Sequence, residues 1–111
     1  MAEIIRIIIT FDNKETAEKI GRGLVERRLA ACAQISGPIK SIYWWKGKIE
    51  EAEEWACTLK SRKDLYKTIE KEIRALHPYD VPQIVAIDID SALPDYAEWI
   101  RSETMMPKIG S

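Results

Sequence analysis

Residues 4–11 read IIRIIITF, and this stretch decides the fold. Six of its eight residues are β-branched, and successive side chains of an extended segment point to opposite faces. One face carries Ile5, Ile7, Ile9 and Phe11, and the other carries Ile4, Arg6, Ile8 and Thr10. Both faces hold large apolar side chains, so the stretch predicts a central β-strand.

Helix and strand signals follow this strand in a regular order. Asp12, with Glu15 three residues later, resembles a capping box that starts an amphipathic helix at about residues 13–29. Ser61 and Asp64 are expected to cap a second helix, which Pro78 ends. The other predicted elements are an extended segment at 30–45 interrupted at Gly37-Pro38, a turn at 46–48, strands at 49–59 and 84–89, and a short helix from Pro94.

The element order β-α-β-β-α-β predicts an α+β, ferredoxin-like sandwich with an extra C-terminal helix and an extended hairpin. Residues 1–111 are expected to form a single domain. In such a sandwich no helix covers the outer face of the sheet. Ile4 and Ile8 nevertheless lie on that face of the first strand, although a solvated face should be polar.

The hairpin is too long for the helix that should cover it. Residues 30–45 would extend over about 53 Å at ~3.3 Å per residue, whereas the helix at 13–29 would span about 25 Å. The distal part carries large apolar side chains, namely Ile42, Tyr43, Trp44, Trp45 and Ile49. An isolated two-stranded ribbon of this kind is marginally stable, so we expect further copies of the chain to cover it.

Composition and charge exclude several functional classes. The 111 residues include 17 Lys+Arg and 18 Asp+Glu, and a net charge of −1 argues against nucleic-acid or polybasic membrane binding. We find neither a membrane-length apolar run nor a signal-peptide pattern, so a cytoplasmic protein with reduced cysteines is expected. Charged residues make up 32%, and amide residues are few, which suggests a thermostable protein.

Cys32 and His77 are the first candidates for chemistry. A thiolate and an imidazole together suit copper or zinc, but the two residues are 45 positions apart and only the fold could bring them together. The structural alternatives are a small buried side chain for Cys32 and a helix-terminal cation for His77. Cys57 is expected in the core, and the methionine pair at 105–106 is expected to form a frayed or packed tail.

Two further clusters have both a functional and a structural interpretation. The carboxylates of Glu50, Glu51, Glu53 and Glu54 could bind a hard cation. Alternation along a strand divides them between two faces, however, so a solvated or salt-bridged edge is favoured. The loop at 77–82 contains two prolines that would hold the polar groups of His77, Tyr79 and Asp80 in a rigid segment, for either packing or binding.

Four segments together resemble the CutA divalent-cation-tolerance family. They are ERRLAACA at 26–33, YWWKGKIE at 43–50, HPYDVP at 77–82 and DYAEWI at 95–100, in the family's order and spacing. The resemblance implies a ferredoxin-like subunit in a homotrimer whose hairpins pair between subunits. Tyr43, Trp44 and Ile49 would then lie in the trimer interface.

The resemblance also implies site residues. Cys32 and His77 match the family's proposed metal-binding groups, and Trp45, Lys60, His77 and Tyr79 match positions lining the cleft between subunits. The implied function is binding of divalent metal ions, copper ahead of zinc and none obligatory, as part of a response to metals and without catalysis.

Two other functions compete with metal binding. One is a module resembling the PII signalling proteins, with small molecules or protein partners bound in the intersubunit clefts. The other is an enzyme such as an acylphosphatase, but residues 10–13 read TFDN, which is acidic and unsuited to cradling phosphate. An RNA-recognition domain shares the strand order, but its base-stacking aromatic residues are missing from the first strand.

Overall fold

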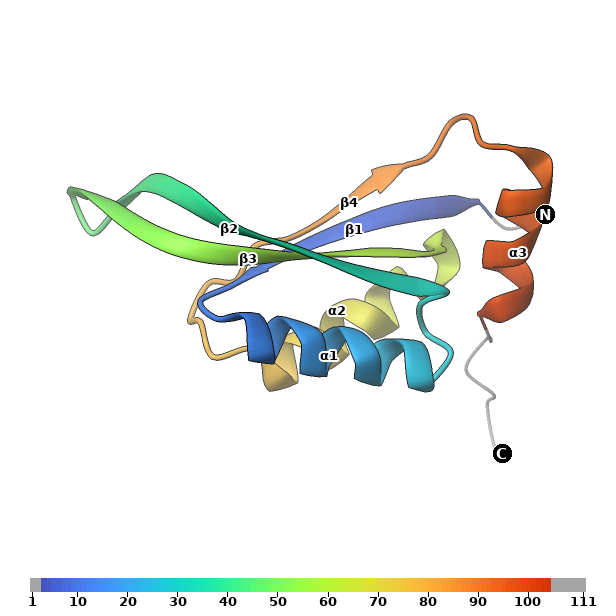
Figure 1. The fold of residues 1–111 in the computed structure, drawn as a ribbon, viewed down its shortest axis with the longest axis horizontal. Coiled ribbons are helices and arrows are strands. Elements are labelled where there is room, and N and C mark those ends of the chain that lie inside the picture. The colour runs from blue at the N-terminus through green and yellow to red at the C-terminus, as the bar shows by residue number, and fades with distance from the viewer. Residues whose placement is uncertain (1–2, 105–111) are drawn as a thin grey trace.

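The computed structural model describes residues 3–104 and has the predicted α+β architecture (Figure 1). One four-stranded antiparallel sheet has the order β2-β3-β1-β4, which is the ferredoxin-like arrangement. The elements are β1 (Ile4–Phe11), α1 (Lys14–Glu26), β2 (Cys32–Trp45), β3 (Lys48–Arg62), the 3₁₀ turn η1 (Lys63–Leu65), α2 (Tyr66–Leu76), β4 (Ile84–Asp88) and α3 (Pro94–Glu103). Met105 and Met106 lie outside the described residues.

The main core lies between the sheet and the helices α1 and α2, which cover the same face of it (Figure 1). β1 is central, as predicted, because it pairs with β3 on one side and β4 on the other. The β1 residues facing the helices are fully buried, namely Ile5, Ile7, Ile9 and Phe11. Cys57 joins them from β3, so its predicted core position is confirmed.

The first helix begins one residue later than the sequence pattern indicates. Asn13, and not Asp12, is the N-cap, and its side-chain oxygen accepts a hydrogen bond from the Thr16 amide at 2.7 Å. Asp12 instead accepts a hydrogen bond from the Asn13 side chain at 3.0 Å. Both residue types cap helices well, so the pattern alone could not distinguish two adjacent candidates.

The predicted cap of the second helix is wrong. Ser61 lies inside β3, fully buried, and its hydroxyl donates to the Leu29 carbonyl at 2.6 Å. The strand continues to Arg62, and α2 starts only after η1. A serine hydroxyl serves a helix end or a buried carbonyl equally well, and the tertiary fold here presents the carbonyl.

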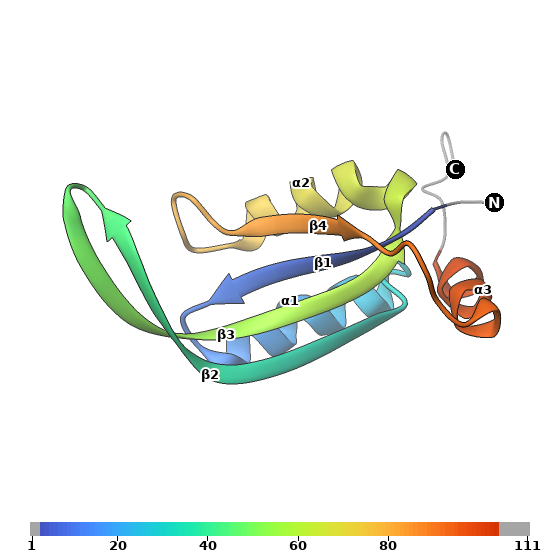
Figure 2. The same ribbon diagram turned by 90° about the horizontal axis from the view of Figure 1, so that it is seen from above.

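The long hairpin is confirmed. β2 and β3 pair from Cys32 opposite Lys60 to Trp45 opposite Lys48, with one register shift at Gly37-Pro38. Its distal part continues beyond the end of β1 and curves away from the sheet (Figure 2). Trp44 and Ile49 lie directly opposite each other there and are 71% and 61% exposed.

The face of the sheet opposite α1 and α2 is only partly covered. α3 packs over one end of it, where Ala97 and Ile100 bury Ile4. This third helix explains why an apolar residue, Ile4, occurs on the sheet face that the sequence pattern predicts to be uncovered. Ile8 is only half-buried, and Val85 beside it on β4 is 44% exposed. No helix among residues 3–104 has the length and apolar character needed to cross a membrane.

Candidate functional site

Cys32 begins β2 on the open face of the sheet, where its thiol is free and half-buried. Its Sγ lies 3.9 Å from the Tyr96 hydroxyl of α3, and the Tyr96 ring stacks on Trp99. Lys60 is its cross-strand neighbour, with the ammonium donating to the Gln34 side chain at 2.9 Å. The thiol is therefore the one soft metal ligand that this part of the described chain presents near its surface.

His77 ends α2 and is buried at the opposite end of the sheet. One ring nitrogen, Nε2, lies 2.7 Å from the Thr10 carbonyl, and the other, Nδ1, accepts from the Tyr79 amide at 3.1 Å. A carbonyl only accepts hydrogen bonds, so the proton is on Nε2. The ring also stacks on Phe11 with 4.5 Å between centroids. Both nitrogens are thus engaged by the backbone, and neither has a free lone pair for a metal.

The fold does not bring Cys32 and His77 together within one chain. Cys32 lies opposite Lys60, whereas Thr10, which binds the imidazole, lies opposite Ala56. Lys60 and Ala56 are four residues apart on β3, which corresponds to about 13 Å along a strand. Across residues 3–104, no group of three or more His, Cys, Asp or Glu side chains is arranged to hold a metal ion. A metal site that uses both Cys32 and His77 therefore remains a prediction, and the two residues would have to come from different subunits.

The half-buried Tyr79 and the buried Glu54 form a pair beside His77. The Tyr79 hydroxyl donates to Glu54 at 2.9 Å, and Glu54 is only 8% exposed. Burial, the hydrogen bond to Glu54 and the negative charge of Glu54 raise the pKa of Tyr79 above its usual value, so this phenol keeps its proton at neutral pH. The hydrogen bonds that link Glu54, Tyr79, His77 and Thr10 thereby fix the loop after α2 to the end of β1 and the middle of β3.

The predicted salt-bridged edge holds for one carboxylate and fails for another. Glu51 forms an ion pair with Lys40 across the hairpin at 2.9 Å. Glu54 lies instead under the loop after α2 and pairs with a phenol. The sequence offered one weak signal, because Glu54 shares its strand face with Ala52 and Ala56, whose small side chains leave room for a covering loop.

A cavity of about 700 Å³ opens beside the Tyr79–Glu54 pair. The projecting hairpin, the end of β1 and the loop after α2 line it. Its walls include Asp12, Tyr43, Trp45, Glu54, Tyr79 and Asp80. We call this cavity the Glu54 pocket. Of the predicted cleft residues, Trp45 and Tyr79 both line this pocket. Lys60 is instead the cross-strand neighbour of Cys32, and His77 is hydrogen-bonded to the Tyr79 amide. Tyr43, predicted for the trimer interface, is also part of its wall.

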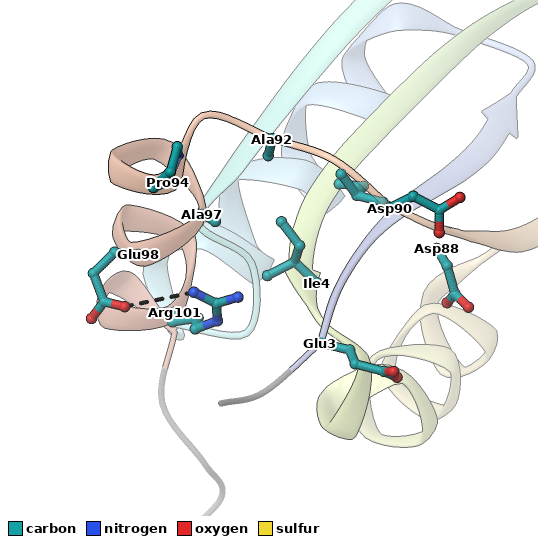
Figure 3. A pocket seen from close by; sticks show the side chains of 10 residues that line it. Glu3, Ile4, Asp88, Asp90, Ala92, Pro94, Ala97, Glu98 and Arg101 are labelled. Carbon is teal, nitrogen blue, oxygen red and sulfur yellow. Dashed lines mark ion pairs between the residues drawn. The ribbon is translucent and has the colours of Figure 1, made fainter.

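A second cavity, of about 760 Å³, lies between the start of β1 and α3 (Figure 3). Three of its four acidic side chains, those of Glu3, Asp88 and Glu98, have cationic partners. Lys63 lies 3.5 Å from Glu3 and 3.1 Å from Asp88, and Arg101 lies 3.6 Å from Glu98. Exposed pairs of this kind are ordinary surface structure, so we assign no ligand to this cavity.

The two thiols are expected to differ in reactivity. Burial raises the pKa of Cys57 to about 12, so its thiol stays protonated at pH 8 and is unreactive toward Ellman's reagent. Native protein should therefore release about one equivalent of chromophore per chain, from Cys32, and denatured protein two. The Cys32→Ser variant should release none until it is unfolded. Fast reaction of the native Cys32→Ser variant would show that Cys57 is accessible.

Comparison with known proteins confirms the predicted family. The family model for the CutA1 divalent ion tolerance protein matches residues 5–103. The divalent-cation tolerance protein CutA of Pyrococcus horikoshii is 44% identical over 101 residues, covering 91% of this chain and 98% of that protein.

Solved structures agree with the sequence comparison. The crystal structure of CutA1 from Oryza sativa superposes with a TM-score of 0.92 at 31% identity, covering 96% of this chain and 97% of that one. The Archaeoglobus fulgidus structure, described as a periplasmic divalent cation tolerance protein, has a TM-score of 0.87 at 41% identity and covers 90% and 97%. By its sequence and its fold, the chain belongs to the CutA1 divalent ion tolerance protein family.

Proposed function

We propose that this chain forms a homotrimer that binds divalent metal ions, copper foremost, and contributes to metal tolerance without catalysing a reaction. The observation that carries the assembly is the projecting hairpin, whose apolar side chains no part of the described subunit covers. Tyr43, Trp44 and Ile49 are all exposed there. Another copy of the chain is the partner that presents the same apolar surface, and packing of hairpins against each other would bury both.

Cys32 is the metal ligand that the geometry supports best. Its thiol is free and reachable on the open sheet face, whereas both nitrogens of His77 are engaged. A single thiolate binds weakly, so further ligands would come from a second subunit. His77 could be one of them only after giving up a hydrogen bond. Two cysteines without a disulfide also suit a reducing cytoplasm, where we place the protein.

Calorimetry under anaerobic conditions tests the copper site. Substitution of Cys32 by Ser is expected to weaken copper(II) binding by about tenfold or more, because it removes the soft ligand. Cys57→Ser is the matched control, since that thiol is buried in the core, and it should leave the isotherm unchanged. Binding should also weaken as the pH falls, because ligands must lose protons to bind. Identical isotherms for wild type and Cys32→Ser would contradict the assignment.

The Glu54 pocket favours a second function, the PII-like module that binds a ligand in its clefts. Its volume lies within the range of about 300–1,000 Å³ that small-molecule sites occupy. Thermal shift measurements against metals, small anions and small cations separate the two functions. Stabilisation by metals alone supports the first, and stabilisation by organic ions supports the second.

A further inference from the structure

The walls of the Glu54 pocket carry negative charge only. Three acidic side chains line it, from Asp12 at the end of β1, Glu54 on β3 and Asp80 in the loop after α2. Among residues 3–104, no lysine or arginine lines it. Because like charges gathered around a cavity attract ions of the opposite sign, this pocket favours a cation over a phosphate or a carboxylate.

Glu54 is the unusual member of this group. It is more than nine-tenths buried, and within residues 3–104 its hydrogen-bond partner is the Tyr79 hydroxyl, with no cation paired to it. Burying a carboxylate without a counter-charge is costly unless hydrogen bonds or a bound cation compensate. Glu51 on the same strand has Lys40 as its counter-ion. Glu54 faces a cavity instead, and a ligand in the cavity can supply the missing positive charge.

The remaining walls suit an organic cation with an apolar body. Tyr43 and Trp45 project from β2 on the same side of the hairpin as Glu54, with Ile42 and Val81 nearby in the lining. Aromatic faces attract cations through their quadrupole, and Lys46 already lies 5.8 Å from the Trp45 ring centroid. The aromatic and aliphatic surfaces would cover the non-polar part of a ligand.

The arrangement of the carboxylates argues against a metal ion in this pocket. Metal ions need several ligands within about 2–2.6 Å of one point. Asp12, Glu54 and Asp80 do not form such a group in the described chain. Carboxylates that flank a cavity without converging fit a larger cation, which can donate hydrogen bonds to one carboxylate and be attracted by the others.

We propose that the Glu54 pocket binds a small primary amine, with its ammonium group at Glu54 and its apolar body against Trp45. This assignment rests on the second function proposed above, in which the pocket is a ligand site, and it names the class of ligand. It is independent of copper binding at Cys32, which lies at the other end of the sheet.

A pair of probes that differ only in charge tests the proposal. The native assembly is titrated with 3-methylbutylamine, which is cationic at pH 7, and with 3-methylbutan-1-ol, its neutral counterpart. Binding is followed by chemical shift changes of the Trp45 indole N–H, assigned with a Trp45→Phe variant. We expect the amine to bind about ten- to a hundredfold more tightly than the alcohol, because its ammonium forms a charge-assisted hydrogen bond.

Two matched substitutions test which carboxylate binds the ammonium group. Glu54→Gln should remove most of the preference for the amine, while its side-chain oxygen can still accept from Tyr79. Glu53→Gln, one residue away on the opposite strand face, should leave the preference intact. If Glu54→Gln does not fold, as circular dichroism would show, the exposed Asp12→Asn should weaken amine binding by a few-fold in its place.

Each result has a definite meaning. Equal affinity of amine and alcohol overturns the cation assignment and leaves the pocket as a ligand site of another class. No shift with either probe, in a preparation that still binds copper, overturns the pocket as a ligand site and leaves metal binding standing. Amine binding that survives both Glu54→Gln and Asp12→Asn places the cation elsewhere and overturns the assignment.

Discussion

A chain carrying Trp44→Glu together with Ile49→Lys is expected to sediment at about its monomer mass of 12.8 kDa, whereas the native chain, as the proposed homotrimer, is expected to sediment at about three times that mass. The two positions lie opposite each other on the hairpin, so the new charges can pair across the strands and leave the ribbon folded. Both side chains are mostly exposed in the single subunit, so neither substitution disturbs its core.

The expected effect is large because an interface tolerates buried charge poorly. In the proposed homotrimer each subunit would bury both side chains, and placing charged groups there costs several kcal/mol per subunit. Loss of the assembly should also lower the unfolding temperature by roughly 10–20 °C, since about 1 kcal/mol shifts Tm by about 4–8 °C in a domain of this size.

Leu76→Lys is the matched control for this prediction. Leu76 is another exposed large apolar residue, but it belongs to the end of α2 and not to the hairpin. The control should retain the mass of the assembly. A native chain that sediments at about 12.8 kDa over a wide concentration range would refute the homotrimer itself. A double variant that remains assembled would place the interface elsewhere than Trp44 and Ile49.

Much of the fold could be predicted because its main signals are local. The alternation in residues 4–11 identifies β1 with the correct ends, and Pro94 identifies the start of α3. The excess length of the hairpin needed only rise-per-residue arithmetic, and it led to the expectation of an assembly. These features depend on residues close in sequence or on lengths that backbone geometry fixes.

The candidate site was harder to predict because it depends on partners distant in sequence. Whether a serine caps a helix or serves a buried carbonyl depends on Leu29, which lies 32 positions before Ser61. The partner of the buried Glu54 is Tyr79, which lies 25 positions later in the sequence. A sequence pattern shows that a side chain can form such contacts, and only the packed chain shows which contact it forms.

The same limit applies to His77, where sequence and structure point to different roles. When only the sequence is considered, a histidine beside a rigid loop is a reasonable metal ligand. In the fold it stacks on Phe11, accepts from the Tyr79 amide and binds the Thr10 carbonyl. It therefore connects the end of β1 to the loop that carries the pocket wall. These hydrogen bonds stabilise the fold, and metal coordination by His77 would break at least one of them.

Substitution of His77 by Ala is accordingly expected to lower the free energy of unfolding by about 3–5 kcal/mol. The loss should be the same with and without copper. The change removes the side-chain partner of the buried Thr10 carbonyl and of the half-buried Tyr79 amide, and it opens a cavity against Phe11. Urea unfolding at a fixed protein concentration measures the loss. His77→Gln, which keeps one donor and one acceptor, should recover part of it.

Copper titration of the same two variants decides between a structural and a ligand role. If His77 is structural, His77→Gln should bind copper as wild type does, because Cys32 and its surroundings at the other end of the sheet are untouched. If His77 is a ligand, His77→Gln should lose copper affinity as Cys32→Ser does, and His77→Ala should unfold near the wild-type urea midpoint in the absence of metal. The hydrogen bonds to Thr10 and Tyr79 favour the first outcome, since an imidazole cannot hold both backbone groups and coordinate a metal ion at the same time.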